Sequence, residues 1–211
     1  PGGSNRKKSL NKNYKEGRKP LRLNRNIQGI LDDNEELRNK IWQQTRLMEY
    51  LNKMPITQIM IPQIEADDVI AYVTQLPSLR DEEKIIVSSD KDFLQLCEGK
   101  TVLFRPIQKE VLNSKRIVEK FGIHPTNFAL ARAIAGDKSD SLKGVPGVGL
   151  KSLAKRLPFF SEEEFCEIPF LIDHCREIES DLKMYKSITE NEKLIKENYK
   201  IMQLYSPGIS P

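Results

Sequence analysis

Seven carboxylates at three places in the chain are the residues best suited to carry chemistry. Two groups come just after segments that are predicted to be strands, and the third lies in a loop. The groups are Glu65, Asp67 and Asp68, then Asp90 and Asp92, then Asp137 and Asp140. Taken singly, acids in a first helical turn or in a loop have ordinary structural explanations. Converging at one edge of a sheet, seven carboxylates would repel each other strongly unless cations lay between them.

The ligand types indicate which cations these would be. His124 and His174 are far apart in the sequence and are interpreted as structural or surface residues, and the three cysteines form no CxxC pair. Oxygen ligands without His or Cys select Mg²⁺ or Mn²⁺ over zinc. Two such ions roughly 4 Å apart can activate water and stabilise both oxygens of a phosphodiester displacement. The carboxylates therefore predict metal-assisted phosphodiester hydrolysis.

A glycine-rich loop follows the third acidic group. It reads GVPGVG over residues 144–149 and lacks the spacing of a Walker loop. Glycines allow backbone amides to approach phosphates closely, and a helix N-terminus near Gly149 favours an anion. This loop predicts a helix–hairpin–helix element that grips one duplex backbone without reading bases, with a structural turn as the alternative. The residues expected to contact DNA here are Gly144, Val145, Gly147, Val148, Gly149, Lys151, Ser152 and Lys155.

The N-terminal segment is strongly basic. Residues 1–26 hold nine Lys and Arg side chains and one Glu, a local charge of +8, so the remainder carries 4 − 8 = −4. A basic arm on an acidic body suits a protein that holds a polyanion and divalent metal, although a solvated tail is the alternative reading. The arm residues expected to contact nucleic acid are Arg6, Lys7, Lys8, Lys15, Arg18 and Lys19.

Hydrophobic periodicity predicts an α/β fold with a central, mainly parallel sheet and flanking helices. Strands are expected at residues 56–61, 84–88, 101–105 and 199–205. Helices are expected at residues 10–17, from an N-cap at Asp33 to before Pro55, after Asp68, and at 93–97, 125–135 and 183–198. Trp42 is interpreted as a packing residue. No segment approaches the ~20 apolar residues of a membrane span.

Three motifs then resemble those of a known family. EADD at 65–68, SSDKDFLQL at 88–96 and GDKSDSLKGVPGVGLKSLAKRL at 136–157 resemble the 5′ nuclease family, which includes phage flap endonucleases and the 5′→3′ exonuclease domain of bacterial DNA polymerase I. The resemblance implies a PIN-like nuclease core. It divides the chain into a helical-arch segment (1–26), the α/β core (27–113) and a helical DNA-binding region (114–211) with a helix–three-turn–helix at about 136–157.

The same resemblance implies roles for individual residues. Glu65, Asp67, Asp68 and Asp90 would serve one metal ion, and Asp92, Asp137 and Asp140 the other. Backbone carbonyls near Val145 and Val148 would hold a K⁺ that bridges to DNA. The segment NYKEGRK at 13–19 resembles the base of the helical arch, where Lys15 and Arg18 would contact the scissile phosphate. The remaining arm would line a gateway for a single-stranded 5′ end.

One departure concerns the start of the chain, which opens at Pro1-Gly2-Gly3. Family members begin with a strand that ends in a metal-binding Asp and carry an Asp-Gly step before the arm. The spacing to Tyr14 and Lys15 indicates that the Asp-Gly step lies just upstream, in a longer polypeptide. A fragment that lacks both features would be unstable and weakly active or inactive.

The expected protein is a monomeric 5′ flap endonuclease and 5′→3′ exonuclease of a bacterial cytoplasm, phage-encoded or cellular. It would act on DNA with a free 5′ end or on RNA–DNA hybrids during replication or repair. A non-catalytic duplex-binding module and a single-strand RNA nuclease are the alternatives.

Overall fold

The computed structural model describes residues 5–16 and 32–205. Residues 1–16 and 61–211 form one unit and residues 17–60 a second unit. The predicted roles of Arg18 and Lys19 fall outside the described residues, as does the side chain of Arg6.

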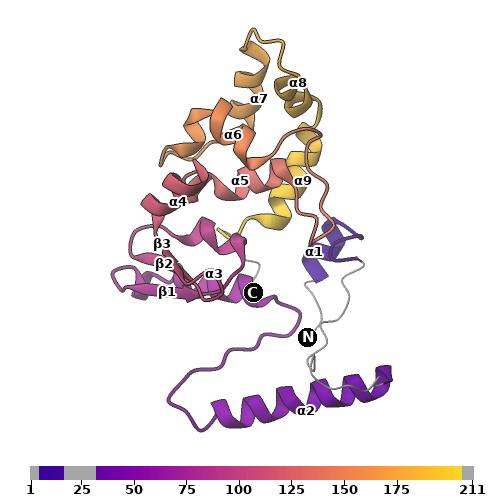
Figure 1. The fold of residues 1–211 in the computed structure, drawn as a ribbon, viewed down its shortest axis with the longest axis vertical. Coiled ribbons are helices and arrows are strands. Elements are labelled where there is room, and N and C mark those ends of the chain that lie inside the picture. Colours follow the sequence, from indigo (N-terminus) through magenta and orange to yellow (C-terminus); the bar gives the residue numbers. More distant parts are fainter. Residues whose placement is uncertain (1–4, 17–31, 206–211) are drawn as a thin grey trace. The chain divides into compact units, whose positions relative to one another are not determined.

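In the first unit, the described residues form helices that pack with a small sheet (Figure 1). The α-helices are α1 (Asn5–Leu10), α2 (Asp33–Leu51), α3 (Ala66–Thr74), α4 (Ser114–Phe121), α5 (Pro125–Ala135), α6 (Leu150–Arg156), α7 (Ile168–Glu177), α8 (Lys183–Glu190) and α9 (Glu192–Met202). The 3₁₀ helices are η1 (Pro77–Leu79), η2 (Lys91–Leu96) and η3 (Pro158–Ser161). The strands are β1 (Lys84–Val87), β2 (Thr101–Arg105) and β3 (Glu110–Leu112).

The sheet confirms the α/β class, but the sheet of the described residues is small and mixed instead of mainly parallel. β1 pairs with β2 in parallel, with Lys84 opposite Thr101, and β2 pairs with β3 antiparallel. On β1 only Ile86 is buried, whereas Ile85 and Val87 are 66% and 65% exposed. The apolar KIIV sequence is typical of a strand that is buried on both faces of a parallel sheet. One of its faces is open to solvent among the described residues.

Two predicted strands are wrong. Residues 56–61 pair with no strand among residues 5–16 and 32–205 and run as irregular chain, although the segment is β-branched and apolar. A strand requires a neighbour to accept its backbone hydrogen bonds, and composition alone does not supply one. Residues 199–205 continue α9 to Met202, because Ile195, Ile201 and Met202 face the interior at helical spacing.

Several helix boundaries also differ from the prediction. The N-cap of α2 is Asp32, which forms a capping box with Glu35, and not Asp33. The N-terminal helix spans Asn5–Leu10, earlier than the predicted 10–17. The helix expected at 183–198 is interrupted at Asn191, whose side chain donates to the Ser187 carbonyl.

Trp42 on α2 does not pack as expected. It is 60% exposed, and its ring lies 5.8 Å from the Arg46 guanidinium. The sequence predicted no membrane-spanning segment. Of the helices in the described ranges, none has the length and apolar character to cross a bilayer.

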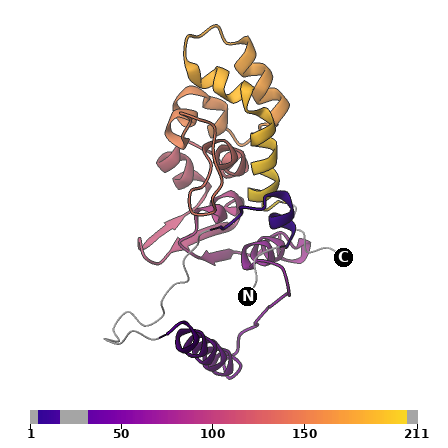
Figure 2. The same cartoon turned by 90° about the vertical axis from the view of Figure 1, so that its right-hand side faces the viewer.

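The main core joins the sheet to the helical part. α9 lies alongside α5, and α1 lies near α9, as Figures 1 and 2 show. The predicted helix 125–135 matches α5, with Pro125 at its first position and His124 as its N-cap. His124 is buried between Ser114 and Thr126, which confirms its structural interpretation.

A second cluster attaches the N-terminal segment. Tyr14 is 4% exposed and packs with Ala133 of α5, Leu142, Ile201 and Met202 of α9. This cluster fixes residues 5–16 beside the loop that follows α5.

The three cysteines are free and buried, and their thiols should be slow to react. Burial raises the pKa of Cys97 and Cys166 to about 12 and that of Cys175 to about 11. The thiolate is the nucleophile, so we expect alkylation by iodoacetamide near pH 8 to be at least ~100-fold slower in the native chain than in urea. Mass spectrometry over time measures this ratio. Similar rates in the two conditions would contradict the burial.

Candidate metal and nucleic-acid site

The first acidic group lies at the start of α3. Glu65 is its N-cap residue, and Asp67 and Asp68 occupy the first turn, where the helix dipole favours negative charge. Glu65 and Asp68 are buried and Asp67 is partly exposed. One carboxylate oxygen from each residue lies within 4.8 Å of the others. These are all hard oxygen ligands, so the group fits a Mg²⁺ or Mn²⁺ ion by donor type and spacing.

The Lys7 ammonium lies among these three carboxylates. Its Nζ is 3.0 Å from Glu65 Oε2, 3.1 Å from Asp67 Oδ2 and 3.5 Å from Asp68 Oδ2, and the residue is 6% exposed. Burial opposes the charge, but the three carboxylates raise the pKa of Lys7 above its ordinary value. Lys7 was predicted to contact DNA from the basic arm, and the structure places its ammonium inside the acidic group.

Lys15 and Tyr14 complete the shell around Glu65. The Lys15 Nζ lies 2.5 Å from Glu65 Oε1, and the Tyr14 hydroxyl donates to Glu65 Oε2 over 3.1 Å. Burial raises the pKa of Glu65, yet Lys15 and Lys7 outweigh it and hold that pKa at about 2. By contrast, burial and the charges of Asp67 and Glu65 raise the pKa of Asp68 despite Lys7. Three carboxylates against two ammonium groups leave −3 + 2 = −1 here, so the group still attracts cations.

Arg132 links Asp92 of the second acidic group to Asp137 of the third. Arg132 of α5 donates from Nε and one terminal nitrogen to Asp92 Oδ1, at 3.2 and 2.9 Å, and makes a short contact with Asp137 Oδ2. Burial and the nearby charges of Asp90 and Asp137 raise the pKa of Asp92 to about 6, in spite of Arg132. Burial also raises the pKa of Asp137, but the hydrogen bonds from Ser139 and the charge of Arg132 outweigh it and hold that pKa below the ordinary range. Arg132 therefore connects the first turn of η2 with the loop after α5.

Asp90 has a local role in this arrangement. It is the N-cap of η2, its side chain accepts from the Asp92 amide at 3.0 Å, and it is exposed. It comes directly after β1, as predicted for the carboxyl end of a strand.

Two glycines close the loop that carries Asp137 and Asp140. A Cβ on Gly136 would lie 2.3 Å from the Gly144 amide nitrogen, and one on Gly144 would lie 2.1 Å from the Ala135 carbonyl oxygen. Only glycine permits this approach, and Asp137 and Leu142 then exchange backbone hydrogen bonds. The closed loop holds Asp140 at 7% exposure.

The N-terminal segment is fastened to the same loop. The Lys15 amide donates to the Asp140 carbonyl at 3.0 Å, and the Ser141 hydroxyl donates to the Glu16 carbonyl at 2.9 Å. Lys15 adopts a left-handed backbone (φ 59°), a conformation that is costly for a side chain with a Cβ and is often found at functional sites. Burial raises the pKa of the Tyr14 hydroxyl. The nearby charges of Asp140, Glu65 and Asp67 raise it further.

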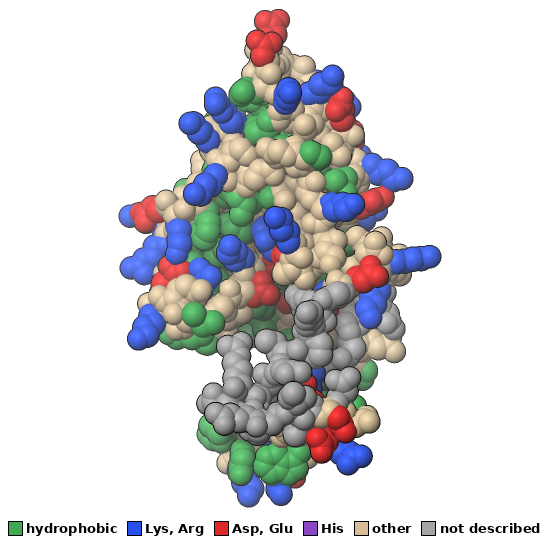
Figure 3. Space-filling model, turned by 45° about the vertical axis from the view of Figure 1, so that its right-hand side comes forward, with side chains coloured by type: hydrophobic (Ala, Val, Ile, Leu, Met, Phe, Trp, Pro, Cys, Tyr) green, Lys and Arg blue, Asp and Glu red, His purple; other side chains and the backbone are tan. Residues whose placement is uncertain are grey.

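The structure thus brings Glu65, Asp67 and Asp68 together and links Asp92 to Asp137 through Arg132. Within the described residues, Glu65, Asp67 and Asp68 are the group of three that could hold an ion together. Asp92 and Asp137 share Arg132, whereas Asp90 borders Asp92 and Asp140 borders Tyr14. Figure 3 shows acidic side chains set back in a hollow, with Lys and Arg side chains around its upper border.

The glycine loop is part of the core at two positions. Val145 and Val148 are buried, and the Val148 amide donates to the Val145 carbonyl. Gly147 has φ +75° and stands in open space, which fits a tight turn. Gly149 is the N-cap of α6, and its amide donates to the Ser152 hydroxyl at 2.9 Å. The Ser152 hydroxyl therefore caps the start of this helix.

Among the other residues predicted to contact DNA, Lys8, Lys151 and Lys155 are exposed. Arg132 and Tyr14 are the site residues that were missing from the sequence-based set. Arg132 is the one charged residue of the helix PTNFALARAIA, directly before the GDKSD loop. A single arginine in an apolar helix next to an acidic loop could have indicated this pairing from the sequence.

Comparison with known proteins places this geometry in a family. Residues 2–122 match the model of the 5′-3′ exonuclease N-terminal resolvase-like domain. A 5′-3′ exonuclease of Buchnera aphidicola is 37% identical over 118 residues, which cover 56% of this chain and 41% of that protein. The flap endonuclease Xni of Shewanella halifaxensis is 32% identical over 199 residues, which cover 94% of this chain and 69% of the relative. The chain spans about two fifths of the length of the first exonuclease.

Solved structures show the same fold. Phage T5 5′-exonuclease with zinc ions bound matches with a TM-score of 0.76 at 21% identity, covering 97% of this chain and 72% of that one. A phage T5 flap endonuclease in a complex with DNA and metal ions matches with a TM-score of 0.74 at 19% identity, covering 97% and 71%. The domain match, the relatives and the fold agree, and the chain belongs to the 5′-3′ exonuclease and flap endonuclease family.

Proposed function

We propose that the chain carries the acidic site and the duplex-gripping loop of a structure-specific 5′ nuclease. The activity would be 5′ flap endonuclease and 5′→3′ exonuclease cleavage of DNA with a free 5′ end, including flaps, nicks and RNA–DNA hybrids met in replication or repair. One observation carries the proposal: Glu65, Asp67 and Asp68 offer three mutually close carboxylate oxygens in a largely buried setting that cations would stabilise.

Two divalent cations, Mg²⁺ or Mn²⁺, would activate water and stabilise the leaving oxygen when they are bound. Glu65, Asp67, Asp68 and Asp90 would hold one of them, and Asp92, Asp137 and Asp140 the other. Arg132 would orient Asp92 and Asp137 through the hydrogen bonds it already makes to both. A K⁺ at the carbonyls of Val145 and Val148 belongs to the same proposal.

The protein's own cations would handle the phosphate. The Lys15 side chain is 24% exposed beside Glu65, so its ammonium can reach a phosphate that approaches the acidic group and can offset charge developing there. Arg18 is proposed for the same task. The exposed Lys151 and Lys155 on α6 would hold the duplex backbone next to the glycine loop.

A test compares substrates on the polypeptide that carries this chain together with the segment expected upstream of it. We expect Mg²⁺-dependent cutting of a 5′-flap DNA, little cutting of a matched 3′-flap DNA or of unstructured RNA, and none with EDTA. Gel analysis of end-labelled substrates measures all four reactions. Equal cutting of the unstructured RNA would replace the flap assignment by a single-strand RNA nuclease.

One observation favours a second function, duplex binding without cleavage. The Lys7 ammonium lies where a cation would contact all three carboxylates, so the acidic group is neutralised in part by the chain itself. This alternative predicts salt-sensitive DNA binding with no Mg²⁺-dependent products.

A further inference from the structure

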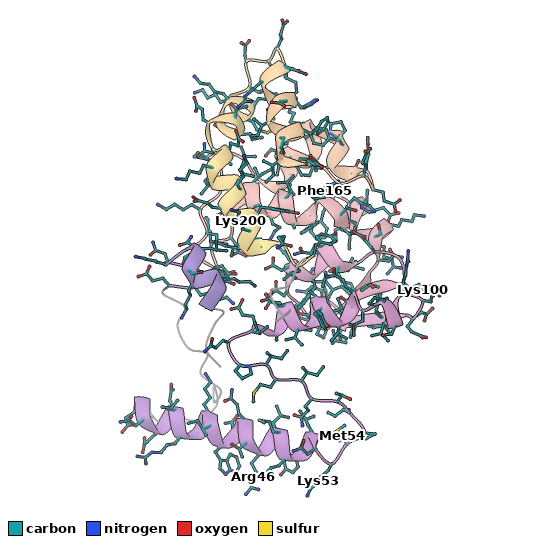
Figure 4. All side chains as sticks on the ribbon, turned by 180° about the vertical axis from the view of Figure 1, so that it is seen from behind. Arg46, Lys53, Met54, Lys100, Phe165 and Lys200 are labelled. Atoms are coloured by element: carbon teal, nitrogen blue, oxygen red, sulfur yellow. The ribbon has the colours of Figure 1, made fainter. Side chains whose placement is uncertain are left out.

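A cavity of about 320 Å³ opens in the helical part of the chain and shares no residue with the candidate metal site. It is lined by Phe159, Phe165, Phe170, Cys166, Glu162, Glu164 and Glu167. Three of its lining side chains are aromatic and three are carboxylates. Figure 4 labels Phe165, which comes from the loop between η3 and α7.

The aromatic wall is partly open to solvent. The rings of Phe159 and Phe170 meet edge to face with centroids 5.3 Å apart, and His174 packs against both at 5.1 and 5.9 Å. Nevertheless Phe165 is 43% exposed and Phe170 is 53% exposed. Large aromatic side chains grouped around an open cavity are typical of a binding surface rather than of scattered surface residues.

A buried asparagine holds the loop of this cavity in place. Asn127 of α5 is 0% exposed, and its amide donates to the carbonyls of Glu162 at 3.0 Å and Glu164 at 2.9 Å. Its side-chain oxygen accepts from the Cys166 amide at 2.8 Å. The loop is therefore set before any partner arrives, so little ordering free energy would be lost on binding.

The rim of the cavity is strongly acidic. Glu162, Glu163, Glu164 and Glu167 are exposed, and none of them makes an ion pair within the part of the chain that the structure describes. Four carboxylates within six residues repel phosphate, so this surface is unsuited to nucleic acid. They attract a cation, and a Lys or Arg side chain gains further from contact with an aromatic face.

We infer that this cavity binds a basic segment of a partner protein. The segment would place an Arg or Lys side chain against Phe159 and Phe170, with its charged group among the glutamates. A neighbouring apolar side chain would cover Phe165. This interaction is independent of the proposed nuclease activity, because it uses none of the carboxylates of the acidic site.

A labelled peptide tests the inference. The probe is a fluorescent peptide of sequence Gly-Ser-Leu-Arg-Leu-Arg-Ser-Gly, and the matched probe has Glu in place of both arginines. We expect saturable binding of the first in fluorescence anisotropy, weakened by added salt, and no binding of the second. Phe170→Ala and Glu164→Lys should each weaken binding about 10-fold. The Glu164 side chain is exposed and Phe170 is 53% exposed, so both variants should remain folded in a thermal melt.

Two control variants stand outside the cavity. Tyr72→Ala removes an aromatic side chain that is 44% exposed, and Glu83→Lys reverses an exposed carboxylate. Both should leave the peptide affinity within about 2-fold of the parent. Absence of binding, or equal losses in cavity and control variants, would overturn the inference. So would self-association that is abolished by Phe170→Ala, because a second copy of the chain would then be the occupant.

Discussion

Asp67→Asn should lower Mg²⁺-dependent cleavage of a 5′-flap DNA by at least ~100-fold, the range found when one charge-stabilising group of an active site is removed. Asp67 is the most exposed of the three clustered carboxylates, and Asn keeps its size, so the fold should survive. The substitution removes one ligand and one negative charge from the group that attracts the cation. Initial rates on an end-labelled flap, at saturating Mg²⁺, measure the loss.

The affinity for DNA, unlike the cleavage rate, should not fall in Asp67→Asn. Removing a negative charge near the phosphate path favours a polyanion, so Asp67→Asn should bind the flap at least as tightly as the parent in Ca²⁺ or EDTA. Asp81→Asn, at an exposed acid in the turn before β1, is the matched control and should change neither quantity. Cleavage that persists in Asp67→Asn would remove the acidic group from the proposed mechanism. Parent protein that binds flap DNA without cutting it would instead support the duplex-binding alternative.

Lys7→Met should destabilise the metal-free chain and strengthen its response to divalent cations. Lys7 is buried against three carboxylates, and removing one partner of such a set leaves uncompensated charge that costs about 3 kcal/mol. For a chain of this size, that loss lowers the melting temperature by roughly 6–12 °C. Because the carboxylates then lack their ammonium partner, Mn²⁺ should stabilise the variant more than it stabilises the parent.

Thermal melts with and without Mn²⁺, together with calorimetric Mn²⁺ titration, measure both effects. Lys8→Met is the control, since Lys8 is the adjacent residue and is exposed. Weaker Mn²⁺ binding in Lys7→Met would show that Lys7 orders the ligands instead of competing with the cation. An unchanged melting temperature would show that Lys7 does not hold the three carboxylates in solution. Both readouts are independent of nuclease activity, so they remain informative if the chain does not cut DNA.

The sequence by itself determined the family and the class of chemistry. Motifs such as EADD and SSDKDFLQL depend on residue type and local order, which the sequence states directly. It also determined α5 and α3, because caps, first-turn acids and helical periodicity act between residues at most four positions apart. The α/β class followed from the alternation of such elements.

Tertiary structure decided which distant groups meet. Lys7 reaches Glu65 across 58 positions, and Arg132 reaches Asp92 across 40; neither pairing leaves a local pattern in the sequence. The apolar segment 56–61 has the composition of a strand but finds no partner in the part of the chain that the structure describes, since strand pairing requires a neighbour. Helices carry their own hydrogen bonds, whereas strands and buried ion pairs depend on contacts that exist only after the chain has folded.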